Sequence, residues 1–120
     1  MTTPNERDLL IEILETALTH WTPQRFAQGS FAKTQNNKIT KYQSDDAVKF
    51  CGMGILLHAA CVLHHESPVG IVLQLDDGFS EPGWLAHLAY QNDSFGYKYA
   101  REVIEQRLES LRIDKLEQSA

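Results

Sequence analysis

The sequence predicts a mainly α protein: a compact bundle of about four helices, with a central buried helix at about 44–64 and a candidate short β-hairpin at about 30–42. Apolar residues recur at three- and four-residue spacing near both ends of the chain, which is typical of amphipathic helices. Residues 44–64 are apolar on nearly every side, as expected of a helix buried inside a bundle. The length of 120 residues corresponds to a single domain.

The first helix is expected to begin at Pro4 and to end before Pro23. Thr3 and Glu6 form a capping-box pattern around a proline at the first helical position. The apolar positions that follow define one stripe along the helix. They are Leu9, Leu10, Ile13, Leu14, Ala17, Leu18 and Trp21.

Residues 30–34 and 38–42 alternate partly between apolar and polar side chains and flank Gln35-Asn36-Asn37. Because asparagine tolerates positive φ, this pattern predicts a β-hairpin. An isolated hairpin is only marginally stable, so we expect it to lean on the helices through Phe31, Ile39 or Tyr42.

The second helix is expected to start with Ser44 as its cap, with Asp45 and Asp46 in its first turn, and to run to about His64. Two glycines inside it, Gly52 and Gly54, would allow close approach of another helix. Two cysteines, Cys51 and Cys61, lie ten residues apart. That spacing rises about 15 Å in a helix, too far for a disulfide.

The Ser67-Pro68 step is expected to break this helix. The β-branched residues in 69–75 predict an extended backbone for that stretch. Asp76-Asp77-Gly78 predicts a turn, and Ser80-Glu81-Pro82 predicts another helix start. The inward positions of that helix are expected to be Trp84, Leu85, Leu88 and Ala89.

Asn92-Asp93-Ser94 is expected to end the third helix and to cap the last one. The last helix is predicted from apolar residues at helical spacing between Tyr97 and Leu111. Its tail, residues 114–120, is expected to fray.

Eleven basic and sixteen acidic residues give a net charge of −5, which argues against a direct nucleic-acid binder. The N-terminus has no signal-peptide pattern, and no window reaches the ~18 apolar residues of a membrane span. We therefore expect a cytoplasmic protein that contacts no membrane.

Three short motifs occur in order along the chain. They are His20-Trp21 with Gln28-Gly29, the stretch 46–55 around Cys51-Gly52-Met53-Gly54, and Tyr90-Gln91-Asn92-Asp93-Ser94 before Glu102-Val103-Ile104. This pattern resembles an uncharacterised family of small phage and bacterial proteins with Cys-x-x-Gly-Ala-like and Trp/Tyr-x-Asn-Asp motifs. Here Ile55 stands in place of alanine and Tyr90 in place of tryptophan. The resemblance implies a compact helical fold, a mobile-element context and binding to a host or phage protein.

The residues indicate no catalytic group and no cofactor. Cys51 lies among apolar neighbours, so it reads as a buried thiol rather than a nucleophile. The acidic pairs are explained by capping and by a turn, and the sequence has no phosphate-binding loop or hydrolase motif.

A metal site is a weak alternative. His58, Cys61 and His65 fall at i, i+3 and i+7, so one helical face would present all three, with His64 adjacent and His87 approaching from another helix.

The candidate binding residues form two groups. Asn92 and Asp93 before a helix would cap it, or would hold a ligand beside Trp84, Tyr97 and Tyr99. A small basic strip of Lys33, Lys38 and Lys41 would contact an acidic partner.

Two functional hypotheses follow. The first is a small non-catalytic binding protein, plausibly phage-encoded, that modulates or inhibits a host protein such as a defence complex. The alternative is a small-ligand or metal-binding protein that uses the His58/Cys61/His65 face or a pocket near Asn92.

Overall fold

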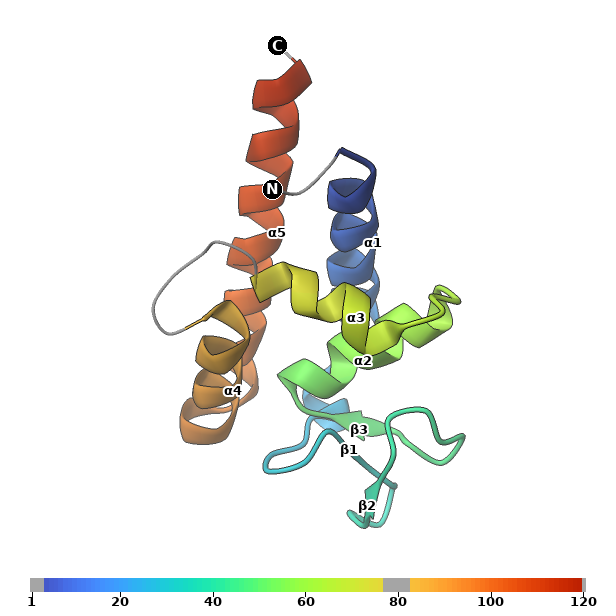
Figure 1. Ribbon diagram of the computed structural model, residues 1–120. Coiled ribbons are helices and arrows are strands. Elements are labelled where there is room, and N and C mark those ends of the chain that lie inside the picture. Colours follow the sequence, from blue (N-terminus) through green and yellow to red (C-terminus); the bar gives the residue numbers. More distant parts are fainter. Residues whose placement is uncertain (1–3, 77–82, 120) are drawn as a thin grey trace.

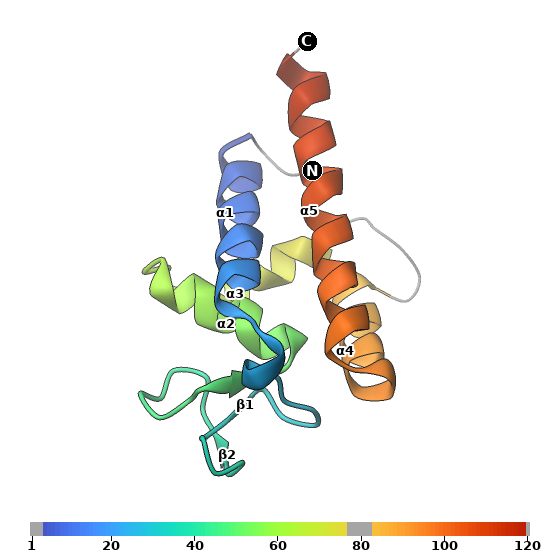
Figure 2. The same cartoon turned by 180° about the vertical axis from the view of Figure 1, so that it is seen from behind.

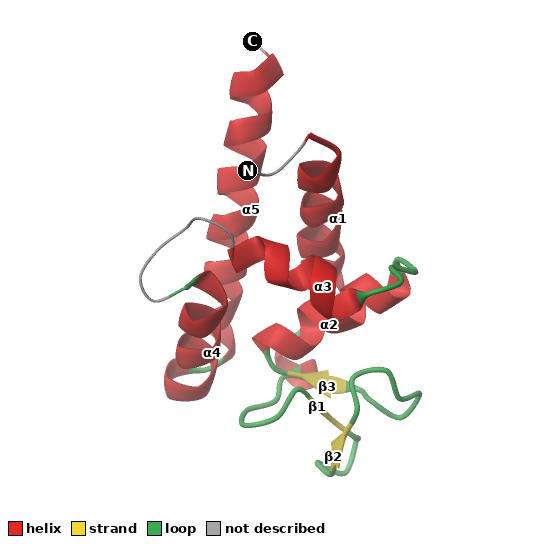
Figure 3. Cartoon of the chain, viewed as in Figure 1, coloured by secondary structure: helices red, strands yellow, loops and turns green. Residues whose placement is uncertain are grey.

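The computed structural model describes residues 4–76 and 83–119. Its described part contains five α-helices and a small three-stranded sheet at one end of the helical body (Figures 1 and 3). The helices are α1 (Pro4–His20), α2 (Gly52–Val62), α3 (Pro68–Leu73), α4 (Trp84–Phe95) and α5 (Tyr97–Ser119). The mainly α class is confirmed. None of the described helices has the length and apolar character that a bilayer span requires.

Helix α1 buries most of the apolar stripe that the sequence predicts, including Leu10, Ile13 and Leu14, whereas Leu9 is exposed. It lies beside α5 in both views of the molecule (Figures 1 and 2). The helix ends at His20, and Pro23 begins the 3₁₀ turn η1 (Pro23–Arg25). The capping residue expected at Thr3 lies outside the described residues.

The predicted hairpin is present. Strand β1 (Ala32–Lys33) pairs antiparallel with β2 (Ile39–Thr40), and Asn37 in the connecting turn has a φ of 65°. Of the side chains expected to lean on the helices, Tyr42 packs against the core, whereas Phe31 and Ile39 are exposed.

The start predicted for the second helix is wrong. Residues 49–50 form a third strand, β3 (Lys49–Phe50), which pairs antiparallel with β1, and α2 begins only at Gly52. The Phe50 carbonyl accepts from Trp21 Nε1 at 2.9 Å and from the Ala27 N–H at 3.0 Å. In a helix that begins at residue 44, the Phe50 carbonyl would accept the Gly54 N–H. In the folded chain it bonds to Trp21 and Ala27 instead, so the helix cannot include residue 50.

The cap of α2 is therefore Cys51, whose Sγ accepts from the Gly54 N–H at 3.3 Å. Ser44 is not a cap. Its hydroxyl, together with that of Thr40, donates to the Asp46 carboxylate, and these two bonds lower the pKa of Asp46.

Helix α2 is the central buried helix that the sequence predicts, and it packs against α1, α3 and α4. A side chain at Gly52 would meet Leu88 of α4, so the expected close helix approach occurs there. Gly54 instead faces the backbone of Phe31, whose carbonyl oxygen would clash with an added Cβ. The helix ends at Val62, and His64 beyond it has a φ of 63°.

The extended stretch predicted at 69–75 is wrong. It forms α3 and the 3₁₀ turn η2 (Gln74–Asp76). The reason is local: Pro68 occupies the first helical position, and Ser67 Oγ accepts from the Gly70 N–H at 3.3 Å.

The helix start predicted at residues 80–82, and the turn predicted beyond Asp76, lie outside the described residues. Asp76 itself accepts the Leu85 N–H of α4 at 2.8 Å. Trp84, Leu85 and Leu88 are buried as predicted, whereas Ala89 is exposed.

The end predicted for this helix is also wrong. Residues 92–94 belong to the last turn of α4, and the corner into α5 is made by Gly96, whose φ is 100°. Glycine adopts this conformation without steric cost. The stretch 114–119, expected to fray, continues α5 as helix, and Lys115 Nζ lies 2.9 Å from Asp8 Oδ1 of α1.

Candidate functional site

Asn92 is the point at which the sequence motifs meet. Its buried side-chain oxygen accepts the Gly52 N–H at 2.8 Å, and its Nδ2 donates to the Ala27 carbonyl at 3.1 Å. One amide thus joins α4 to the start of α2 and to the segment before β1. A buried amide paired on both sides fixes these three segments relative to each other.

The segment before β1 is attached to α4 by further bonds. Gln28 Nε2 donates to the Asn92 carbonyl at 3.1 Å, and the Gly29 N–H donates to Asp93 Oδ1 at 3.2 Å. Asn92 Nδ2 lies 3.1 Å from the same Asp93 oxygen. The Asn-Asp pair therefore binds a distant loop from inside α4, and it does not cap α5.

A pocket of about 150 Å³ opens beside these bonds. Its walls come from the loop before β1, from the start of α2 and from the outer side of α4. The lining residues are Gly29, Ser30, Phe31, Cys51, Met53, Ala89, Asn92 and Asp93. We refer to it as the Asn92 pocket.

The chemistry of the Asn92 pocket is mixed. Phe31, Met53 and Ala89 supply apolar wall. Asp93 is the single charged residue that lines it. The Ser30 hydroxyl is buried and has no hydrogen-bond partner among the described residues.

Cys51 stands in this pocket as a protonated thiol. Burial raises its pKa, and the negative charge of Asp93 raises it further. Only the thiolate is a strong nucleophile, so the local environment opposes nucleophilic chemistry at this sulfur. The prediction that Cys51 is buried is confirmed.

Three aromatic rings stand in a row where α4 meets α5. Tyr90 and Phe95 have ring centroids 5.9 Å apart, and Phe95 and Tyr99 have centroids 5.6 Å apart. Their exposed fractions are 59%, 55% and 47% respectively. We call Tyr90, Phe95 and Tyr99 the aromatic corner. Tyr99 was expected near a binding site, whereas Tyr90 entered only as a motif residue and Phe95 was not singled out. Tyr90 falls out of phase with the buried stripe of α4, but Phe95 falls in phase with it, so the helical period does not predict the exposure of Phe95.

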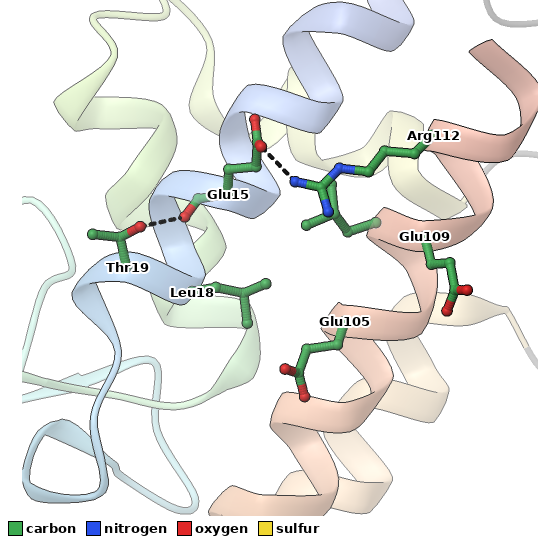
Figure 4. Close-up of a pocket in the computed structure, with 7 residues that line it drawn as sticks. Glu15, Leu18, Thr19, Glu105, Glu109 and Arg112 are labelled. Carbon is green, nitrogen blue, oxygen red and sulfur yellow. Dashed lines mark hydrogen bonds and ion pairs between the residues drawn. The ribbon is translucent and has the colours of Figure 1, made fainter. Parts of the chain in front are cut away.

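A larger open groove of about 590 Å³ runs between α1 and α5 (Figure 4). Leu18 and Leu108 contribute its apolar surface. The charged side chains are Glu15, Glu105, Glu109 and Arg112. Arg112 pairs with Glu15 across the groove (Figure 4), and Glu105 lies 3.8 Å from Arg101 Nε on the same helix. The charged residues that line the groove are exposed, so each interaction is weak in water.

Two predicted binding residues lie away from the Asn92 pocket. Trp84 is buried at the opposite end of α4, about 12 Å along the helix from Asn92. The Tyr97 ring packs against Trp21, with centroids 4.9 Å apart, and its hydroxyl donates to the Trp21 carbonyl at 2.9 Å. The rings of Trp84 and Tyr97 therefore pack in or against the hydrophobic core and do not line the Asn92 pocket.

The predicted basic strip belongs to the small sheet. Lys33 is half-buried in β1, whereas Lys38 and Lys41 are exposed on either side of β2. The strip lines neither the Asn92 pocket nor the groove.

The geometry assumed for the metal alternative does not form. Helix α2 ends before His65, so His58, Cys61 and His65 do not share one helical face. His58 instead stacks on Phe50, with ring centroids 4.5 Å apart, and meets the His20 ring edge at 6.0 Å. Across residues 4–76 and 83–119, no three His, Cys, Asp or Glu side chains are grouped closely enough to hold a metal ion.

Comparison of the chain with family models, with curated proteins and with solved structures finds no match. The resemblance to the uncharacterised phage and bacterial family stays a prediction.

Proposed function

We propose that this protein is a non-catalytic binding protein that docks on a partner protein through the aromatic corner. The observation that carries the proposal is the row of three half-exposed rings of Tyr90, Phe95 and Tyr99. Tyrosine and phenylalanine are enriched in protein interfaces and among the residues that dominate their binding energy. A fully buried aromatic side chain covers roughly 150–250 Å². About half of each side chain is still exposed here, so the three together supply roughly 300 Å² of the ~800 Å² that each partner buries in a typical interface.

The corner is also rigid, which favours binding. Its rings contact each other, the turn at Gly96 fixes the angle between α4 and α5, and Asn92 ties the last turn of α4 to α2. Side chains that are already ordered lose little conformational freedom on association.

The partner is expected to carry a basic surface. The chain has a net charge of −5, and Asp93 stands three residues after Tyr90 on α4. Complementary charge steers association and selects partners. The resemblance to phage and bacterial proteins makes a cytoplasmic host protein, for example a component of a defence complex, the first partner to test.

The experiment is a quantitative affinity purification from a lysate of the source organism or its host. The bait is compared with a Phe95→Ser/Tyr99→Ser double variant and with Leu116→Ser, which removes an even more exposed apolar side chain near the far end of α5. Circular dichroism confirms that each variant is folded.

We expect one partner to be retained by the wild type and by Leu116→Ser, and to be at least about tenfold depleted with the double variant. Equal recovery by all three baits, or recovery of no specific partner, contradicts the proposal.

A further inference from the structure

We infer that the Asn92 pocket receives a lysine side chain of the docked partner, with the alkyl stem along Phe31, Met53 and Ala89 and the ammonium group at Asp93. This inference rests on the proposed function, because the lysine arrives on a protein that covers the aromatic corner. The two features are contiguous in the chain: Ala89 of the pocket precedes Tyr90, and Asp93 stands two residues before Phe95.

The size of the pocket suits one long side chain. Its volume is about 150 Å³. A cavity of about this volume is known to hold a single benzene-sized group. The four-carbon stem and ammonium group of lysine are of the same scale, whereas a nucleotide or a folded peptide segment is far larger.

The polar end of the pocket is arranged to accept hydrogen bonds. One oxygen of Asp93 is held by the Gly29 N–H and by Asn92 Nδ2, which orients the carboxylate. Asp93 is itself exposed, so its carboxylate is open to an incoming group. The buried Ser30 hydroxyl has no hydrogen-bond partner among the described residues. An ammonium group has three donors and no acceptor, so it can bond to both.

Other occupants fit less well. An anion would be repelled by the carboxylate of Asp93, which lines the pocket beside Cys51. A purely apolar group would leave the Ser30 hydroxyl without a partner and would desolvate the carboxylate, both of which cost free energy.

The test is an NMR titration of the isotope-labelled full chain with Nα-acetyl-lysine methylamide. The matched neutral probe is Nα-acetyl-norleucine methylamide, which keeps the alkyl stem and lacks the ammonium group. We expect saturable shifts at the amides of Gly29, Ser30 and Met53, and a norleucine affinity at least about tenfold weaker.

Two charge variants make the test specific. Asp93→Asn keeps an oxygen that can accept the Gly29 N–H but removes the charge, and it is expected to abolish the preference for lysine. Glu109→Gln removes the same charge from the groove between α1 and α5 and is expected to bind as the wild type does.

Equal affinity for the two probes overturns the inference, as does lysine binding that Asp93→Asn leaves unchanged or shifts confined to the groove residues. The affinity purification separates this failure from that of the proposed function. If the double aromatic variant loses the partner and Asp93→Asn retains it fully, docking through the aromatic corner is supported and lysine binding in the Asn92 pocket is rejected. If the probe binds but no bait captures a partner, the pocket is a site for free cations and the partner lysine is rejected.

Discussion

The side chain of Asn92 supplies Gly52 with the hydrogen bond that the start of α2 lacks in its own segment. Its Oδ1 accepts the Gly52 N–H at 2.8 Å from forty residues further along the chain. The first N–H groups of a helix have no partner within the helix, and here Asn92 and the Cys51 thiol serve two of them. The residue that fixes this junction also forms the polar wall of the Asn92 pocket, so the pocket and the fold depend on the same contact.

Replacing Asn92 by alanine is expected to destabilise the protein by about 2–3 kcal/mol, because the buried Gly52 N–H and the Ala27 carbonyl both lose their partner. The measurement is the free energy of unfolding from urea denaturation. The matched control is Ser94→Ala, an exposed position two residues further along α4, which should change stability by less than about 0.5 kcal/mol. A similar effect of the two variants would contradict the role assigned to Asn92.

Replacing Gly54 by alanine is expected to cost about 3 kcal/mol or to prevent folding, because the new Cβ would clash with the Phe31 carbonyl oxygen. That oxygen belongs to backbone and cannot rotate away. Gly70→Ala in α3 is the comparison, since its Cβ would meet the Ser67 side chain rather than backbone, and that side chain can shift at the cost of weakening its cap bond to the Gly70 N–H. Thermal unfolding of both variants checks the difference, and a Gly54→Ala protein as stable as the wild type would show that β1 and α2 do not approach as described.

Replacing Asp76 by alanine is expected to cost about 1 kcal/mol, because its carboxylate accepts the Leu85 N–H at 2.8 Å and the local cap Gly83 offers no side chain. Asp76→Asn keeps an acceptor and should lose less. Denaturant titration distinguishes the two variants, and equal losses would mean that the effect of Asp76 is not the hydrogen bond.

Stability is expected to fall as the pH drops below the ordinary histidine value of 6.5, with His58 as a cause. Burial lowers the pKa of His58, and the positive charge of Arg25 and the neighbouring His20 lower it further. The unfolded chain therefore binds its proton at a higher pH than the folded chain does. The free energy of unfolding decreases as the pH is lowered from 6.5 through the folded pKa of His58 and levels off below it.

The measurement is urea denaturation at a series of pH values for the wild type and His58→Gln. The glutamine variant cannot titrate, so its stability should depend less steeply on pH in this window. A variant that keeps the wild-type slope would assign the pH dependence to other groups.

The elements that can be predicted from the sequence are those whose signals are local. The apolar spacing of α1 and α5, the continuous apolar run of α2 and the turn around Asn37 are encoded within each segment, because helical period and turn preference act between near neighbours. Burial of Cys51 followed in the same way from its apolar neighbours. The start of α3 was also encoded locally, in Ser67 and Pro68, but the β-branched residues that follow pointed to strand.

The start of α2 and the contacts of Asn92 depend on interactions between segments that are distant in the sequence. The Phe50 carbonyl can bond to Gly54 in a helix, or to Trp21 and Ala27 in the folded chain, and the choice depends on residues more than twenty positions away. The Asn92 pocket and the aromatic corner arise likewise, from a loop, a helix start and a helix corner that folding brings together. Local preference is worth only about 1 kcal/mol per residue, so burial and hydrogen bonding between distant segments override it.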